Sequence, residues 1–192
     1  MSHTTDNQDT SIQDQFATIK SKYTSIQLHV TSIMIQSTHE SINHILSKIA
    51  HISTMYPTIS SEMITNSNIN TTILSQIESS VTYYHDMLIC YKNNLTTTFN
   101  TMTLIFNEIQ TTTDWLTNSY NKYLHTCKFQ THMYNSQHMR LCNYTNMFVS
   151  SYNEYEQSQK NYTLMLTLIN KLENMANEQH DTVMLLYAFS ET

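Results

Sequence analysis

The absence of glycine constrains this chain more than any other feature of its sequence. None of the 192 residues is glycine and only one, Pro57, is proline, whereas these residues usually make up about 7% and about 5% of a protein. Tight β-turns, bulges and phosphate-binding loops depend on glycine, but helices do not. The composition therefore argues against Rossmann, P-loop and most β-barrel folds, and it predicts an all-α protein.

The spacing of the apolar residues is the second indication of helices. We use the word seam for a row of apolar residues along one face of a predicted helix. In the first seam the intervals alternate between four and three residues, which is the heptad pattern of packed helices and not the period of two that strands require. Its residues are Ile12, Phe16, Ile19, Tyr23, Ile26, Val30 and Ile33.

The first seam loses its register after Ile33 and resumes at Ile42, and two further seams follow at 81–123 and 148–187. The third seam includes Tyr155, Tyr162, Leu166 and Ile169, with polar residues at Gln159, Glu173 and His180. Ser, Thr and Asn, which are abundant here, are each roughly 0.5 kcal/mol worse than alanine in a helix. Isolated helices of this composition would be unstable, so the seams must pack within the chain or against a partner.

The domain organisation follows from the few helix-breaking signals. We expect an elongated antiparallel helical bundle or coiled coil of three to four long helices. Proline disfavours helix at the residue before it, and Thr58 or Ser60 can cap a helix that follows Pro57. The expected parts are a disordered tail at 1–8 and a single domain at 9–192, with breaks near 57–60 and 135–137 and weaker signals at 66–72 and 111–114.

The stretch THESINHILSKIAH, residues 38–51, resembles the start of a zinc-binding H-E-x-x-H helix. The second histidine of that pattern would stand at position 43, but the sequence has asparagine there and histidine at His44. His44 and His51 lie two helical turns apart on one stripe, beside the apolar face. We therefore interpret the stretch as the restart of a helix after the register slip, not as a metal site.

A second group of soft ligands lies further along the chain, between residues 125 and 142. His138 and Cys142 are spaced by four residues, which suits two ligands on one helix face, and His125 and His132 are spaced by seven. No Cys-x-x-Cys pair accompanies them. These four residues are the candidate metal ligands of an alternative hypothesis, a metal-binding helical bundle, while our main expectation is no metal and no cofactor.

The charge pattern excludes several classes of function. Only 12% of the residues are charged, Arg140 is the single arginine and the net charge is −6, so we expect no nucleic-acid partner. The sequence contains no run of about 20 apolar residues, so no transmembrane helix is predicted.

The three cysteines form no disulfide framework and the polar N-terminal residues do not resemble a signal peptide, which favours an intracellular location. No nucleophile motif is present, so we do not expect an enzyme.

The function predicted from these features is structural. We expect a non-enzymatic helical protein that serves in scaffolding, assembly or partner binding through its seams, either with a protein partner or by self-association into an oligomer. A second hypothesis is an amphipathic protein at a membrane surface, although the scarcity of Lys and Arg disfavours anionic lipid.

Overall fold

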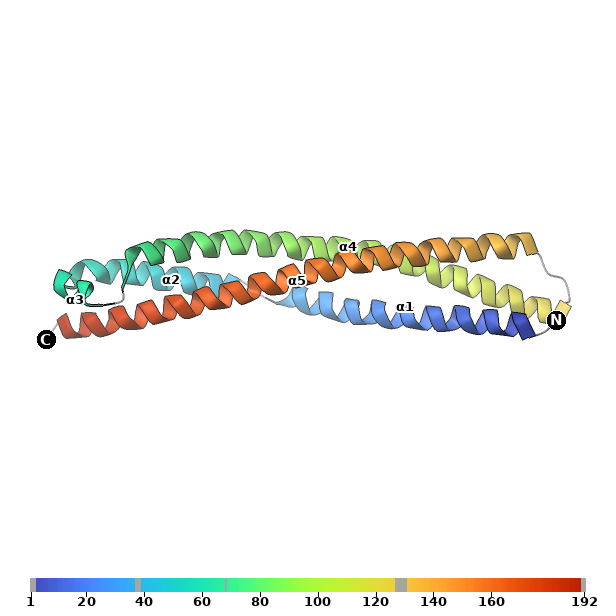
Figure 1. The fold of residues 1–192 in the computed structure, drawn as a ribbon, viewed down its shortest axis with the longest axis horizontal. Helices are drawn as coiled ribbons and strands as arrows, with labels where there is room; N and C mark the ends of the chain where they lie inside the picture. The colour runs from blue at the N-terminus through green and yellow to red at the C-terminus, as the bar shows by residue number, and fades with distance from the viewer. Residues whose placement is uncertain (1–2, 37–38, 68, 127–130, 191–192) are drawn as a thin grey trace. The chain divides into compact units, whose positions relative to one another are not determined.

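Helices account for all the regular structure in the described part of the chain. The computed structural model describes residues 3–36, 39–67, 69–126 and 131–190, and no strand occurs among them. The elements are α1 (His3–Ile35), α2 (His39–Met55), the 3-10 turn η1 (Tyr56–Thr58), α3 (Ser61–Thr65), α4 (Thr71–Thr126) and α5 (Thr131–Ser190) (Figure 1). The prediction of an all-α helical bundle is confirmed.

The chain divides into two compact units, whereas one domain was expected from its sequence. The first unit comprises Met1–Ile35 and Asn93–Ser158, and the second comprises Gln36–Lys92 and Gln159–Thr192. Helix α4 therefore gives its first part to the second unit and its later part to the first. Helix α5 does the reverse, so each unit is built from three long helical segments.

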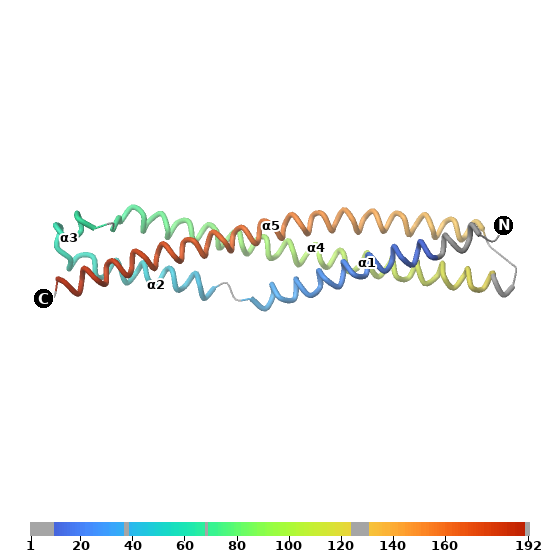
Figure 2. The backbone as a smooth tube through the Cα atoms, turned by 60° about the horizontal axis from the view of Figure 1, so that its bottom comes forward, coloured from blue at the N-terminus to red at the C-terminus, as the bar shows by residue number. Residues whose placement is uncertain are grey.

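In the first unit, α1 runs parallel to α5 and antiparallel to α4 (Figures 1 and 2). Aromatic rings hold α1 against α4: the Tyr23 ring stacks on Phe106 with centroids 4.3 Å apart and on Phe99 at 5.7 Å, and Phe16 stacks on Phe106 at 5.9 Å. The Tyr23 hydroxyl also shares a 3.0 Å hydrogen bond with Thr103. Each such ring pair contributes about 0.5–1.5 kcal/mol beyond the area it buries, so this cluster fixes the register of α1 on α4.

In the second unit, the end of α2 and the turn after it close over a compact core. Its buried members are Ile52, Met55, Ile59, Ile69, Leu74 and Val183, which come from α2, the connecting segments, α4 and α5. Pro57 lies in η1, and Ser60 is the N-cap of α3, where its hydroxyl accepts a 3.3 Å hydrogen bond from the amide of Met63. η1 and the N-cap of α3 therefore lie within 56–60, at the position of the expected break, and the cap is Ser60, one of the two expected residues.

Every seventh residue of α4 and α5 is buried over most of each helix. We call these two sets the heptad rows, and no member of either is more than 6% exposed. The row of α4 is Leu74, Val81, Leu88, Leu95, Met102, Ile109 and Leu116, and the row of α5 is Leu141, Phe148, Tyr155, Tyr162, Ile169, Ala176 and Val183. The rows include the main positions of the second and third predicted seams, which confirms their period.

Three expected boundaries differ from the structure. Helix α4 continues through 111–114 and α5 through 135–137, while α1 begins at His3, inside the tail expected to be disordered. Thr112 and Thr113 are buried, so tertiary packing outweighs the weak helix preference of these residues. The other weak signal, at 66–72, overlaps the interval between the end of α3 at Thr65 and the start of α4 at Thr71. Along the described helices, no segment is both long and apolar enough to cross a lipid bilayer.

Candidate functional site

Two pairs of polar side chains connect α2 and α5 in the second unit. His44 Nδ1 lies 2.9 Å from Glu173 Oε1, and His51 Nδ1 lies 2.9 Å from His180 Nε2. Both pairs join residues 129 positions apart, so α2 and α5 run parallel with a constant register. We call these four residues the histidine ladder.

The spacing of seven residues on both helices explains why the ladder forms. His44 and His51 stand next to Ile45 and Ile52, which are fully buried, so the histidines lie at the edge of the core and face the neighbouring helix. The sequence places them on one stripe, as expected, and it marks Glu173 and His180 as polar positions within the third seam. It does not reveal that these two stripes meet, because the pairing depends on the tertiary register.

The pair of His51 and His180 depends on protonation. A hydrogen bond between two imidazole nitrogens needs one N–H donor and one unprotonated acceptor, so the contact is lost when both rings are charged. Burial, the nearby Lys48 ammonium and His51 lower the pKa of His180, against a smaller opposing effect of Asp181, whose Oδ1 lies 3.8 Å from His180 Nδ1. These surroundings therefore favour the neutral form of His180.

The pair of His44 and Glu173 is of a different kind. The side chain of His44 is 52% exposed and that of Glu173 is 24% exposed, so water screens their attraction. Ion pairs in such surroundings contribute about 0.2–1 kcal/mol. This pair orients α2 on α5 more than it stabilises the unit.

The three candidate metal ligands whose side chains the structure describes, His132, His138 and Cys142, belong to no cluster that could hold a metal ion. His138 Nδ1 lies 3.9 Å from Cys142 Sγ on α5, and Cys142 and His132 are exposed. The side chain of His125 lies outside the described residues. Throughout the described part of the chain, no three His, Cys, Asp or Glu side chains come close enough together to hold a metal ion. The His39 ring meets the edge of His85 with centroids 5.0 Å apart, which is a ring contact between α2 and α4.

A further histidine, not singled out from the sequence, lies in the first unit. His29 of α1 shares a hydrogen bond through Nδ1 with the hydroxyl of Tyr155, a member of the α5 heptad row. Burial lowers the pKa of His29 and raises the pKa of Tyr155 to about 12. The hydroxyl of Tyr155 thus has a polar partner within a row of mostly apolar residues. Its seven-residue relation to Tyr162 is visible in the sequence, but its pairing with His29 is not.

The residues of the predicted interaction seams mostly pack against other helices of the same chain. Phe16, Tyr23 and Leu166 are half-buried. The buried members are Ile12, Ile19, Ile26, Val30, Ile33, Tyr155, Tyr162 and Ile169. A partner could reach these buried side chains only by displacing a helix of the bundle.

Large apolar side chains that contact water remain on the outside of the helices. They include Leu28 at 70% exposed, Ile35 at 79% and Leu104 at 69%, with Val149 at 47%. Leu28 and Ile35 are seven residues apart on α1 and therefore share one face of that helix.

A scan against protein families, a search of curated proteins and a search of solved structures each found no match.

Proposed function

We propose that this chain is a non-enzymatic assembly protein, a helical scaffold that associates with a second copy through the outer faces of its bundle. The observation that carries the proposal is the exposure of large apolar side chains on helices whose inner faces are already filled. Leu28, Ile35 and Val149 lie outside the core, although buried residues run along the same helices. Partner binding by a bundle of this kind would use side chains that the fold itself does not need.

The energy of burial supports this proposal. Moving a Leu, Ile or Val side chain from water into an apolar contact is favourable by about 1.5–3 kcal/mol. Single exposed apolar residues are common on any protein, and interaction surfaces are marked by several that lie together. Leu28 and Ile35 lie on one face of α1, which is consistent with such a surface. The small number of charged residues, 12% of the chain, also leaves few groups that would oppose association.

The test is the mass of the full chain in solution. Sedimentation velocity and light scattering over the micromolar range should show an oligomer of one defined size that dissociates on dilution. Nonspecific aggregation would instead give sizes that grow with concentration. A compact and stable monomer at every concentration in this range would refute the proposal.

A further inference from the structure

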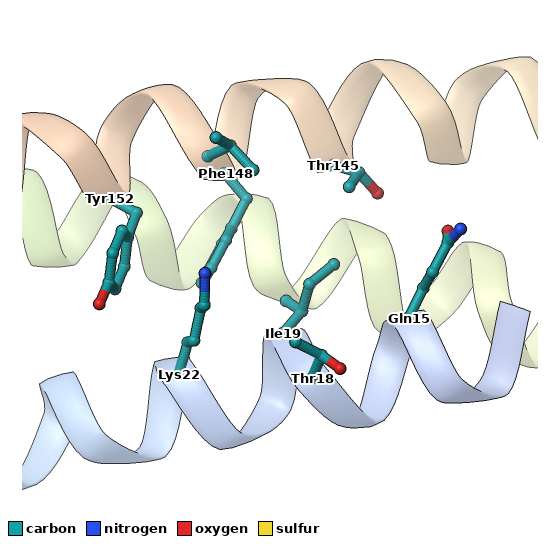
Figure 3. A pocket seen from close by; sticks show the side chains of 8 residues that line it. Gln15, Thr18, Ile19, Lys22, Thr145, Phe148 and Tyr152 are labelled. Carbon is teal, nitrogen blue, oxygen red and sulfur yellow. The ribbon is translucent and has the colours of Figure 1, made fainter. Parts of the chain in front are cut away.

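A groove of about 230 Å³ lies between α1 and α5 in the first unit (Figure 3). Ile19 and Lys22 reach from α1 toward α5, while Tyr152 reaches from α5 toward α1, and α4 lies behind them (Figure 3). The α1 wall consists of four residues at positions i, i+3, i+4 and i+7, namely Gln15, Thr18, Ile19 and Lys22. The α5 wall has the same spacing and consists of Thr145, Phe148, Val149 and Tyr152.

This spacing is the one by which a helix receives a side chain from a neighbouring helix. In knobs-into-holes packing, four residues at positions i, i+3, i+4 and i+7 surround one inserted side chain. The groove presents two such sets side by side on parallel helices. Ile19 and Phe148 are buried at its base, and Val149 is 47% exposed at its edge. The spacing of the lining residues is therefore suited to packing by a helix.

We propose that this groove is the dimer interface of the chain, in which α1 and α5 of a second copy pack antiparallel across a two-fold axis near Thr18 and Phe148. The inference rests on the proposed function and specifies the surface and the occupant. A two-fold interface must be complementary to itself, and the charges of α1 satisfy this condition. Asp14 and Lys22, both exposed, lie four residues before and four residues after Thr18.

The antiparallel arrangement therefore brings Asp14 of each copy opposite Lys22 of the other. Lys22 already extends over the groove, with its Nζ 4.7 Å from the centre of the Tyr152 ring. The available area also suits a dimer: residues 131–158 of α5 are roughly 40 Å long at 1.5 Å per residue, and two helices are roughly 20 Å wide. That face is on the order of the 800 Å² that each partner buries in a standard interface.

Cysteine crosslinking tests the position of the axis. In a chain whose native Cys90, Cys127 and Cys142 are replaced by serine, Thr18→Cys should form a covalent dimer under mild oxidation. Thr24→Cys is the matched control, because both threonines are exposed on α1 and both bond the carbonyl four residues before them, at 3.0 Å and 2.9 Å. Equal crosslinking at both positions, or none at Thr18→Cys, would contradict the proposed axis.

A charge exchange tests the antiparallel pairing. Asp14→Lys alone, or Lys22→Asp alone, replaces two attractions with two repulsions across the axis. Each should weaken the dimer about fivefold, which corresponds to about 1 kcal/mol, because two weak attractions between exposed charges are lost and two repulsions of similar size are gained. The double exchange should restore the original affinity. A double variant as weak as the single ones would overturn the pairing.

The apolar part of the groove is tested with Val149→Asp, which should abolish the dimer without loss of helicity. Leu104→Asp is the control, because Leu104 is more exposed and lies on α4 of the same unit, away from the groove residues. If the wild-type chain dimerises and Val149→Asp does not change this, the groove is the wrong surface and the proposed function survives. If the wild-type chain is monomeric, the proposed function fails as well.

Discussion

The heptad row of α4 makes a quantitative prediction about stability. Leu95 is 1% exposed in this row, whereas Leu104 stands nine residues later on the same helix, in the same unit, and is 69% exposed. Replacing each with alanine removes the same atoms from two different surroundings. Comparing the two variants therefore isolates the contribution of burial.

The expected magnitude follows from the atoms removed. Leu95→Ala deletes three carbon atoms, worth about 2.4 kcal/mol at about 0.8 kcal/mol per methylene. The cavity left behind adds about 24 cal/mol per Å³ that the neighbours do not fill, so the total loss in the free energy of unfolding should be about 3–5 kcal/mol. Leu104→Ala should cost less than about 0.8 kcal/mol, because most of its side chain is already in water and alanine is the better helix former.

The assay is urea unfolding followed by far-ultraviolet circular dichroism. All variants are compared at one protein concentration, because self-association adds to the apparent stability. Unchanged slopes of the unfolding free energy against urea would show that the midpoints report stability. A loss below about 1 kcal/mol for Leu95→Ala, well short of the usual range for a buried leucine, would refute the assignment of this row as core, as would equal losses for both variants.

Three other predictions concern protonation and capping. Burial lowers the pKa values of His29 and His180, so the folded state binds fewer protons than the unfolded state. The contribution of these neutral histidines to the free energy of unfolding should be fully present above the unfolded pKa of about 6.5. It should be lost as the pH falls from there through their lower pKa values in the folded state. Urea titrations across this range measure the loss, and unchanged stability down to pH 4 would contradict it. The pKa of Tyr155 is raised to about 12, so the contribution of this neutral tyrosine to the free energy of unfolding should be present below about pH 10 and lost as the pH rises through about 12. In an ultraviolet titration of tyrosinate, the ionisation at the highest pH should be missing from Tyr155→Phe. Ser60→Ala should destabilise α3 by about 1 kcal/mol, seen as faster hydrogen exchange at the Met63 amide, while Ser61→Ala, which leaves the cap in place, should not.

Much of the fold could be predicted because its main signals are local. The intervals between Ile12 and Ile33 specify a helix face directly, and Pro57 marks a boundary by its own stereochemistry. The breaks expected at 111–114 and 135–137 were wrong because Thr, Asp, Asn and Ser disfavour helix only weakly. Burial of Thr112 and Thr113 supplies packing energy that no local preference reveals.

The histidine ladder shows where prediction from sequence ended. The stripe of His44 and His51 was visible, and so were Glu173 and His180 as polar positions in a seam. Their meeting depends on an offset of 129 residues, which is set by the packing of the helices between them. The same applies to His29 and Tyr155, which are 126 residues apart.

The heptad rows of α4 and α5 also determine which changes in chain length the protein can accept. Deleting one residue within a helix rotates every later side chain by about 100° about the helix axis relative to those before it. A single deletion after Met102 would therefore turn Ile109 and Leu116 out of the core together, although neither residue is altered. Loss of seven residues would keep the faces aligned but would shorten one helix against its neighbours. Substitutions in these helices can be absorbed one at a time, whereas insertions and deletions should be confined to the connections between helices or occur as matched heptads.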